Sequence, residues 1–204
     1  MTAGRSRLIE HFVTDRRRFG LSTDALIDRA AEAARRGVDV IQVRERDLPD
    51  RVLVALVRRV VEVTAGTGAR VLVNDRLDVA IAAGAAGVHL RSDSPSASRI
   101  RAIAGSGLLI GRSVHSMPEV DAAVADGGCD YLMFGTVFPS SGKPEGHPIA
   151  GLDALKDVCR RSPLPVVAIG GVDRSRVEHI EAAGAAGFAA VGLFMRLTPL
   201  SEVV

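Results

Sequence analysis

Short apolar runs alternate with helical patterns along the whole chain, and this alternation limits the fold more than any other feature of the sequence. The runs with the composition of buried strands lie at 8–13, 38–43, 69–73, 87–90, 108–111, 131–135, 164–170 and 188–194. Most segments between them have helical patterns, several of which open with Ser or Asp and close with Gly. Alternating strands and helices predict a parallel sheet, and eight such units close a (β/α)8 barrel. An open, doubly wound sheet is the alternative.

The length of the chain fits a single domain of this kind. We predict one α/β domain over residues 1–204, folded as a single (β/α)8 TIM barrel. After the eighth run only 195–204 remains, which is short for a closing helix. We therefore expect an abbreviated last helix, or a second subunit that covers this part of the barrel, as in a homodimer.

Composition argues against nucleic-acid and membrane partners. With 26 basic and 24 acidic residues, the chain lacks the one-signed clustering of a nucleic-acid-binding protein. The basic run 16–19 is short and fits an exposed loop at least as well as a phosphate-facing segment. No stretch approaches the roughly 20 apolar residues of a membrane span, and the first residues lack the apolar run of a secretion signal. Cys129 and Cys159 have no metal-ligand spacing and are typical of thiols in a reducing compartment, so we expect a cytoplasmic protein.

Polar clusters follow most of the apolar runs at their carboxyl ends. They lie at 44–46, 74–76, 91–94, 113–116, 136–143 and 170–171. In a barrel these ends converge on one mouth, where active sites occur. The clusters are rich in cations and poor in acids, which predicts an anionic ligand. Only two of the basic residues are lysines, and one of them, Lys143, lies in a glycine-containing loop of this mouth.

Two arginines after the second run are candidates for binding this anion. Arg44 and Arg46 alternate with Gln42, so the three side chains share one face of a strand. If that face is the barrel interior, the guanidinium groups can bind phosphate through several donors. Alternatively, they pair with Glu45 or Asp47 in a surface network.

A glycine pair and an aspartate suggest a phosphate site and a metal site. Gly170 and Gly171 follow the seventh run, and Gly192 lies in the eighth, where barrels often bind phosphate. Asp75 follows the third run, and a carboxylate beside bound phosphate commonly holds Mg²⁺. The alternative is an Asx turn or a helix cap made by Asn74 or Asp75.

No established catalytic motif stands out among the histidines and serines. The sequence has no Ser-His-Asp order, HExxH, P-loop or GxGxxG pattern. His115 is a candidate acid or base, or else a hydrogen-bonded structural residue. We expect His89 to pack inside its strand and His147 to be exposed in its loop.

Seven segments together resemble the thiamine-phosphate synthase family, which includes the TenI-type thiazole tautomerases. The matching segments are VTDR at 13–16, IQVRERD at 41–47, the ND and GVHL parts of 73–90, GRSVHS at 111–116, FGTVFPSSGK at 134–143 and PVVAIGGV at 165–172. The resemblance implies a barrel in which Mg²⁺ and basic residues help diphosphate leave a hydroxymethylpyrimidine. The nitrogen of a thiazole phosphate then attacks the pyrimidine cation. Such a reaction needs charge stabilisation and positioning more than a strong base.

The resemblance also implies roles for individual residues. The expected catalytic residues are Arg44, Arg46, Ser113 and Lys143. The expected substrate-binding residues are Gln42, Asn74, Ser140, Gly170, Gly171, Gly192 and Leu193, of which the glycine segments hold the thiazole phosphate. Asp75 is the expected Mg²⁺ ligand, with Asp93 as a second one.

The chain departs from the family pattern at four places. Arg46 stands where the family has a lysine, and Gly192 where it has a serine. The synthase segment GQxD is RSDS here, so the second metal-binding aspartate aligns with Ser94, and Asp93 can replace it only if the loop shifts. The tautomerases carry a catalytic histidine where this chain has Thr136.

Three functions fit these patterns. The first is a thiamine-phosphate synthase with an altered metal loop, and the second is a TenI-type thiazole tautomerase. The third is a barrel that binds a thiazole or thiamine phosphate without turnover. Mg²⁺-dependent release of diphosphate would identify the first, and activity on the thiazole alone would identify the second.

Overall fold

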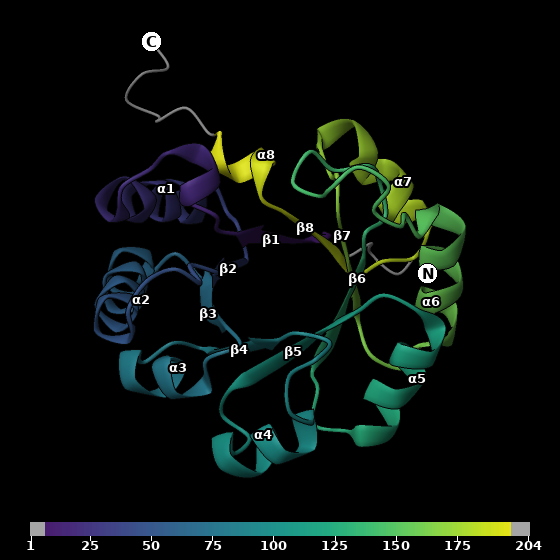
Figure 1. Ribbon diagram of the computed structural model, residues 1–204, viewed down its shortest axis with the longest axis horizontal. Helices are drawn as coiled ribbons and strands as arrows, with labels where there is room; N and C mark the ends of the chain where they lie inside the picture. Colours follow the sequence, from purple (N-terminus) through teal and green to yellow (C-terminus); the bar gives the residue numbers. More distant parts are fainter. Residues whose placement is uncertain (1–6, 197–204) are drawn as a thin grey trace, which may run out of the picture.

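The computed structural model describes residues 7–196, which form a closed barrel of eight parallel strands. Each strand pairs with the next along the chain, and β8 pairs with β1 to close the ring (Figure 1). The strands are β1 (Ile9–Val13), β2 (Val40–Val43), β3 (Arg70–Asn74), β4 (Gly87–Leu90), β5 (Leu109–Val114), β6 (Tyr131–Gly135), β7 (Val166–Ile169) and β8 (Gly187–Ala190). The predicted (β/α)8 barrel is therefore confirmed, and the open sheet is not observed.

Helices follow the strands and surround the barrel (Figure 1). They are α1 (Thr23–Arg35), α2 (Asp50–Thr64), α3 (Leu77–Ala83), α4 (Ala97–Ala104), α5 (Met117–Asp126), α6 (Gly151–Arg161), α7 (Val177–Ala182) and α8 (Gly192–Met195), with short 3-10 helices η1 (Arg17–Phe19) and η2 (Arg174–Arg176). The serine N-cap expected at the start of α1 forms, where Ser22 accepts a main-chain N–H bond, and Ser96 and Ser116 cap α4 and α5 in the same way. The last helix of the described residues, α8, is as short as predicted, with four residues. No helix in 7–196 is long and apolar enough to cross a membrane.

Alternation along the strands separates two packed layers. In β3, Val71 and Val73 belong to the large apolar layer between the sheet and the helices. The side chains of the opposite face point into the barrel, where Val13, Met133, Val167 and Ala189 form a separate buried cluster. Because side chains alternate along a strand, the residues in register with this cluster also point inward. Gln42, Asn74 and Ser113 lie on this inner face.

The centre of the barrel contains an aromatic polar group in place of further aliphatic side chains. The ring centroids of His11, His89 and Tyr131 lie 5.7 to 6.3 Å from one another. Gly111 gives Tyr131 its space, because a Cβ atom at this glycine would lie 2.1 Å from the tyrosine ring. Through His89, this polar centre contacts Ser113 near the carboxyl end of β5.

Candidate functional site

The carboxyl ends of all eight strands meet at one mouth of the closed barrel, and the predicted site residues lie there. Asn74 is the last residue of β3, and Ser113 is the last but one of β5. Arg44 and Asp75 directly follow β2 and β3. The loop after β6 carries Ser140 and Lys143; Gly170 and Gly171 follow β7, and Gly192 and Leu193 begin α8. The structure thus brings the predicted residues to one end of the barrel.

Arg44 and Arg46, which follow β2, form no ion pair with the neighbouring Glu45 and Asp47 among the described residues. Glu45 is buried and accepts hydrogen bonds from the Thr14 hydroxyl at 2.7 Å and the Arg16 main-chain N–H at 3.0 Å. The guanidinium of Arg16 also pairs with Asp47 at 2.5 Å. Burial raises the pKa of Glu45 above its ordinary value, and the hydrogen bonds from Thr14 and Arg16 oppose this rise.

Because Glu45 and Asp47 pair with Arg16, the guanidinium groups of Arg44 and Arg46 keep N–H donors that can bind a ligand. Arg46 is exposed, and the guanidinium of Arg44 has a long contact of 3.8 Å to Asp15. The predicted alternative, in which Arg44 and Arg46 pair with Glu45 or Asp47, does not form among the described residues.

A hydrogen-bonded chain links the mouth to the polar centre of the barrel. His89 Nε2 lies 2.9 Å from Ser113 Oγ, and His89 Nδ1 lies 2.9 Å from the Tyr131 hydroxyl. Gln42 Nε2 lies 3.5 Å from His11 Nε2 on the other side of the same centre. His89 therefore packs as predicted, but it also contacts a predicted catalytic residue, which the sequence did not indicate.

The two central histidines are held in the neutral form. Burial lowers the pKa of His89 from 6.5 to about 3. Burial also lowers the pKa of His11 well below its ordinary value, and the nearby His89 lowers it further. Burial raises the pKa of Tyr131 far above its ordinary value, so its hydroxyl keeps its proton. The centre of the barrel is therefore polar and uncharged at neutral pH.

An arginine lies between the two carboxylates predicted to bind Mg²⁺. Arg91 forms a very short ion pair with Asp93, and its guanidinium lies 3.7 Å from Asp75. Asp75 also accepts a hydrogen bond from the hydroxyl of Ser94. The described residues contain no group of three or more His, Cys, Asp or Glu side chains arranged to hold a metal. As arranged here, the two carboxylates do not fit a resident Mg²⁺ ion, because a guanidinium already occupies the position between them.

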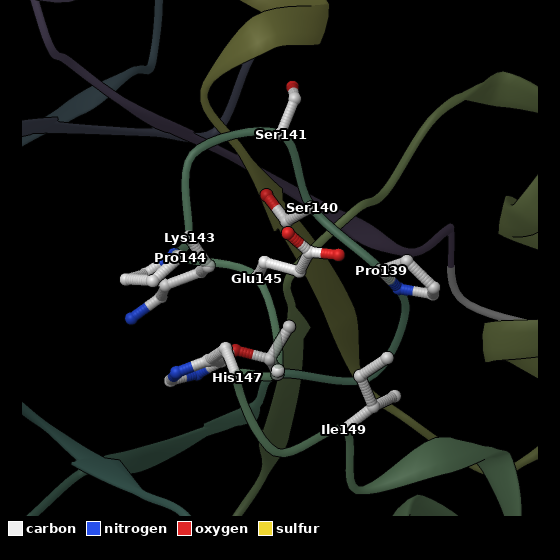
Figure 2. A pocket seen from close by; sticks show the side chains of 10 residues that line it. Pro139, Ser140, Ser141, Lys143, Pro144, Glu145, His147 and Ile149 are labelled. Atoms are coloured by element: carbon white, nitrogen blue, oxygen red, sulfur yellow. The ribbon is translucent and has the colours of Figure 1, made fainter.

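The loop after β6 surrounds a cavity of about 310 Å³ at the mouth. Figure 2 shows Ser140, Lys143 and His147 on the chain segment around this cavity. The buried hydroxyl of Thr136 lies 3.1 Å from His147 Nε2. His147 is half-buried, so the prediction that it is exposed was wrong, because the loop folds back onto Thr136. Glu145 adds an acid to a mouth that the sequence indicated to be poor in acids.

Two further arginines meet these loops, and sequence analysis did not assign them. Arg18 donates to Ser141 at 2.8 Å, and Gly142 allows this approach because a Cβ there would lie 2.3 Å from the guanidinium. Arg176 stacks over the ring of Phe138, 4.8 Å from its centroid, and donates to the carbonyl of Gly171. The basic run 16–19 was the available signal for Arg18. No local pattern marked Arg176.

The glycine turn after β7 packs directly against the β6 loop. Gly170 and Gly171 have φ angles of +104° and +62°, which favour glycine. A Cβ atom at Gly170 would lie 2.5 Å from a side-chain carbon of Thr136, and one at Gly171 would lie 2.2 Å from the carbonyl oxygen of Pro139. Both glycines are therefore required for the joint between the two loops, whatever they bind.

His115 agrees with its structural alternative. Its Nδ1 lies 2.6 Å from the carbonyl oxygen of Gly135 and its main-chain N–H donates to Glu119. The first contact joins the end of β5 to the end of β6, and the second joins it to α5.

A model of the family described as thiamine monophosphate synthase matches residues 10–194. The chain belongs to this family. The match starts in β1 and ends in α8, so it includes every strand of the barrel.

Named relatives of the family cover most of the chain. A thiamine-phosphate synthase of Methanoculleus marisnigri is 43% identical over 164 residues, 80% of this chain and 77% of its own length. A thiamine-phosphate synthase of Roseiflexus sp. is 37% identical over 90% of this chain and 76% of its own length. Among solved structures, the thiamine phosphate pyrophosphorylase of Pyrococcus furiosus is 28% identical and superposes with a TM-score of 0.80, covering 96% of this chain and 91% of that one.

Proposed function

We propose that this chain is a thiamine-phosphate synthase that couples hydroxymethylpyrimidine diphosphate to a thiazole phosphate and releases diphosphate. The observation that carries the proposal is its 43% identity, over 80% of its length, to a relative named for this activity. The cation-lined mouth supports it, because both substrates are anions.

The proposed reaction transfers the pyrimidine methylene carbon from the diphosphate oxygen to the thiazole nitrogen. The bond between the pyrimidine methylene and the diphosphate oxygen breaks, and the electron pair leaves with diphosphate. The lone pair of the thiazole nitrogen then forms the new C–N bond. No proton acceptor is needed at the reacting carbon, which agrees with a mouth without a catalytic triad. The protein contributes positioning and stabilisation of the leaving charge.

The diphosphate would be bound by the cations that the structure leaves with available donors. Arg44 and Arg46 lie on one side of the mouth and Lys143 on the other, with Ser140 in the same loop as Lys143. Arginine can bind phosphate oxygens through two parallel donors, whereas lysine acts as a point charge. We assign Gln42, Asn74 and Ser113 to the pyrimidine side because they face the barrel interior below this cluster.

The thiazole phosphate would bind at the joint between β7 and β8. We assign this role to Gly170, Gly171, Gly192 and Leu193, whose backbone an anion can approach closely. Arg176 and Arg18 hold the neighbouring loops in place around this position.

These roles need no ion held between Asp75 and Asp93, where Arg91 lies.

The tautomerase alternative is not favoured. The relatives from Methanoculleus marisnigri and Roseiflexus sp. carry the synthase name, and the position of the tautomerase histidine holds Thr136. A threonine hydroxyl is a poor proton carrier near neutral pH. A binding protein without turnover would be recognised by bound thiazole phosphate without product.

The two lysines of the chain provide a matched test. Lys143 lies at the mouth, whereas Lys156 is exposed on α6. Lys143→Gln should lower kcat/KM for the pyrimidine diphosphate by about 100-fold, the usual effect of removing one stabiliser of developing charge. Lys156→Gln should leave the rate unchanged. Equal rates for both variants would refute the position of the diphosphate, and no product from the wild type would refute the function.

Two further expectations stay predictions. Light scattering of the purified chain would test the homodimer suggested by the short last helix. Localisation of a tagged chain in cells would test the cytoplasmic assignment.

A further inference from the structure

The segment after β4 places a guanidinium where a metal ion would bridge carboxylates. Arg91 contacts both Asp93 and Asp75, and it comes directly after the strand. A guanidinium carries a permanent positive charge and five N–H donors. It therefore supplies to this corner of the mouth the same sign of charge as a divalent cation.

The other residue of this corner also replaces a metal ligand. Ser94 donates its hydroxyl hydrogen to Asp75 and accepts the main-chain N–H of Arg91 at 2.8 Å. A hydroxyl that is engaged in this way offers neither the charge nor the free oxygen of an aspartate. Mg²⁺ is usually held by carboxylates together with substrate phosphates and waters.

Hydrogen bonds from Arg112 hold the loop after β4 in this arrangement. Arg112, on β5, donates to the main-chain carbonyls of Ser92 and Pro95 at 2.9 Å and to that of Ser94 at 3.1 Å. These bonds lie on both sides of Asp93. A shift that moved Asp93 into the position of Ser94 would have to break them, so Asp93 does not readily become the second metal ligand.

We propose that Arg91 takes the place of Mg²⁺ in this chain, binding the departing diphosphate so that the reaction proceeds without a divalent metal ion. The proposal rests on the synthase function proposed above. When the C–O bond breaks, its electron pair leaves on the diphosphate oxygen, and the guanidinium stabilises this charge together with Arg44, Arg46 and Lys143. No oxidant, reductant or additional reactant enters the step.

Arg91 is accessible enough for this role. Its side chain is 39% exposed, and that of its partner Asp93 is 65% exposed. Exposed pairs of this kind contribute little to stability because water screens them. A diphosphate with several charged oxygens can therefore displace Asp93 from the guanidinium, while Asp75 keeps the side chain at the mouth.

Binding of inorganic diphosphate tests the proposal without catalysis. Isothermal titration calorimetry of the full chain is done in excess chelator and again with Mg²⁺. We expect the two Kd values of the wild type to agree within about threefold, and Arg91→Gln to weaken binding in chelator at least about tenfold. Arg99→Gln, which removes an exposed arginine of the adjacent α4, is the control and should bind as the wild type does. Arg91→Lys should recover part of the affinity because it restores the charge.

Product formation in chelator completes the test. We expect the wild type to keep its rate, and the double variant Arg91→Gly, Ser94→Asp, which rebuilds the GQxD pattern at these two positions, to need Mg²⁺. A wild type that is inactive in chelator and active with Mg²⁺, or an unchanged Kd in Arg91→Gln, would overturn the proposal. Failure of the proposed function itself is recognised separately, because the wild type would then form no product with or without Mg²⁺.

Discussion

The neutral histidines in the centre of the barrel make stability depend on pH above the range in which most carboxylates titrate. The pKa of His89 is lowered from 6.5 to about 3 in the folded protein, and that of His11 is also lowered. Between these values the unfolded chain binds more protons than the folded one. The stability that these neutral histidines contribute should therefore be fully present above pH 6.5, and the free energy of unfolding should fall as the pH falls toward 3.

The size of this effect follows from the shift itself. For His89, which stays neutral in the fold, the loss between pH 7 and pH 5 is about 2 kcal/mol, and the lowered pKa of His11 adds a loss in the same direction. This is a large share of the roughly 5–15 kcal/mol that stabilise a typical domain. Glu45 acts in the opposite direction, because its pKa is raised in the folded protein. Carboxylates whose pKa is lowered, such as Asp126, destabilise the folded protein mainly when they take up protons at lower pH.

Urea denaturation at pH 7, 6 and 5 measures the slope. We expect His89→Gln, which cannot take up a proton, to reduce the loss between pH 7 and 5 by about 2 kcal/mol. His179→Gln is the control, because this histidine is exposed on α7, and it should keep the slope of the wild type. An unfolding free energy that is flat from pH 7 to 5, or an equal slope in wild type and His89→Gln, would refute this account of the barrel centre.

Three other variants test separate parts of the structure. Tyr131→Phe removes the hydroxyl next to His89 Nδ1. We expect the free energy of unfolding to fall by about 1–2 kcal/mol and the ¹⁵N chemical shifts of that imidazole to change, whereas unchanged shifts would contradict the hydrogen bond. Gly171→Ala places a Cβ atom against the carbonyl of Pro139 at a positive φ, and should cost about 1–3 kcal/mol, whereas a stable variant would show that this turn is not strained. Arg112→Gln removes three bonds to the loop after β4 and should increase amide hydrogen exchange there; protection equal to the wild type would show that the loop is held by other contacts.

The barrel itself could be predicted because its signals are local. Each strand is a short apolar run, and the serine that caps α1 directly precedes that helix. The place of a residue at the end of a parallel strand then fixes its place at the mouth. For this reason the sequence places Arg44, Asn74, Ser113 and the glycines after β7 at one end of the barrel.

The contacts between side chains could not be predicted, because they join residues far apart in the chain. His89 contacts Ser113 and Tyr131 across the barrel interior, and Arg18 contacts Ser141 over 123 positions. A histidine in an apolar run has the same pattern whether it only packs or also contacts a serine at the end of a neighbouring strand. The altered loop after β4 was visible in the sequence, but the position of Arg91 between two carboxylates was not.

The most direct test of the central claim is the stoichiometry of the reaction catalysed by the purified chain. The chain is incubated with hydroxymethylpyrimidine diphosphate and the thiazole phosphate, and thiamine phosphate and diphosphate are quantified in parallel, with Mg²⁺ and in chelator. We predict that the two products form in equal amounts and only when both substrates are present. Release of diphosphate without thiamine phosphate, or no product under either condition, would contradict the proposed synthase.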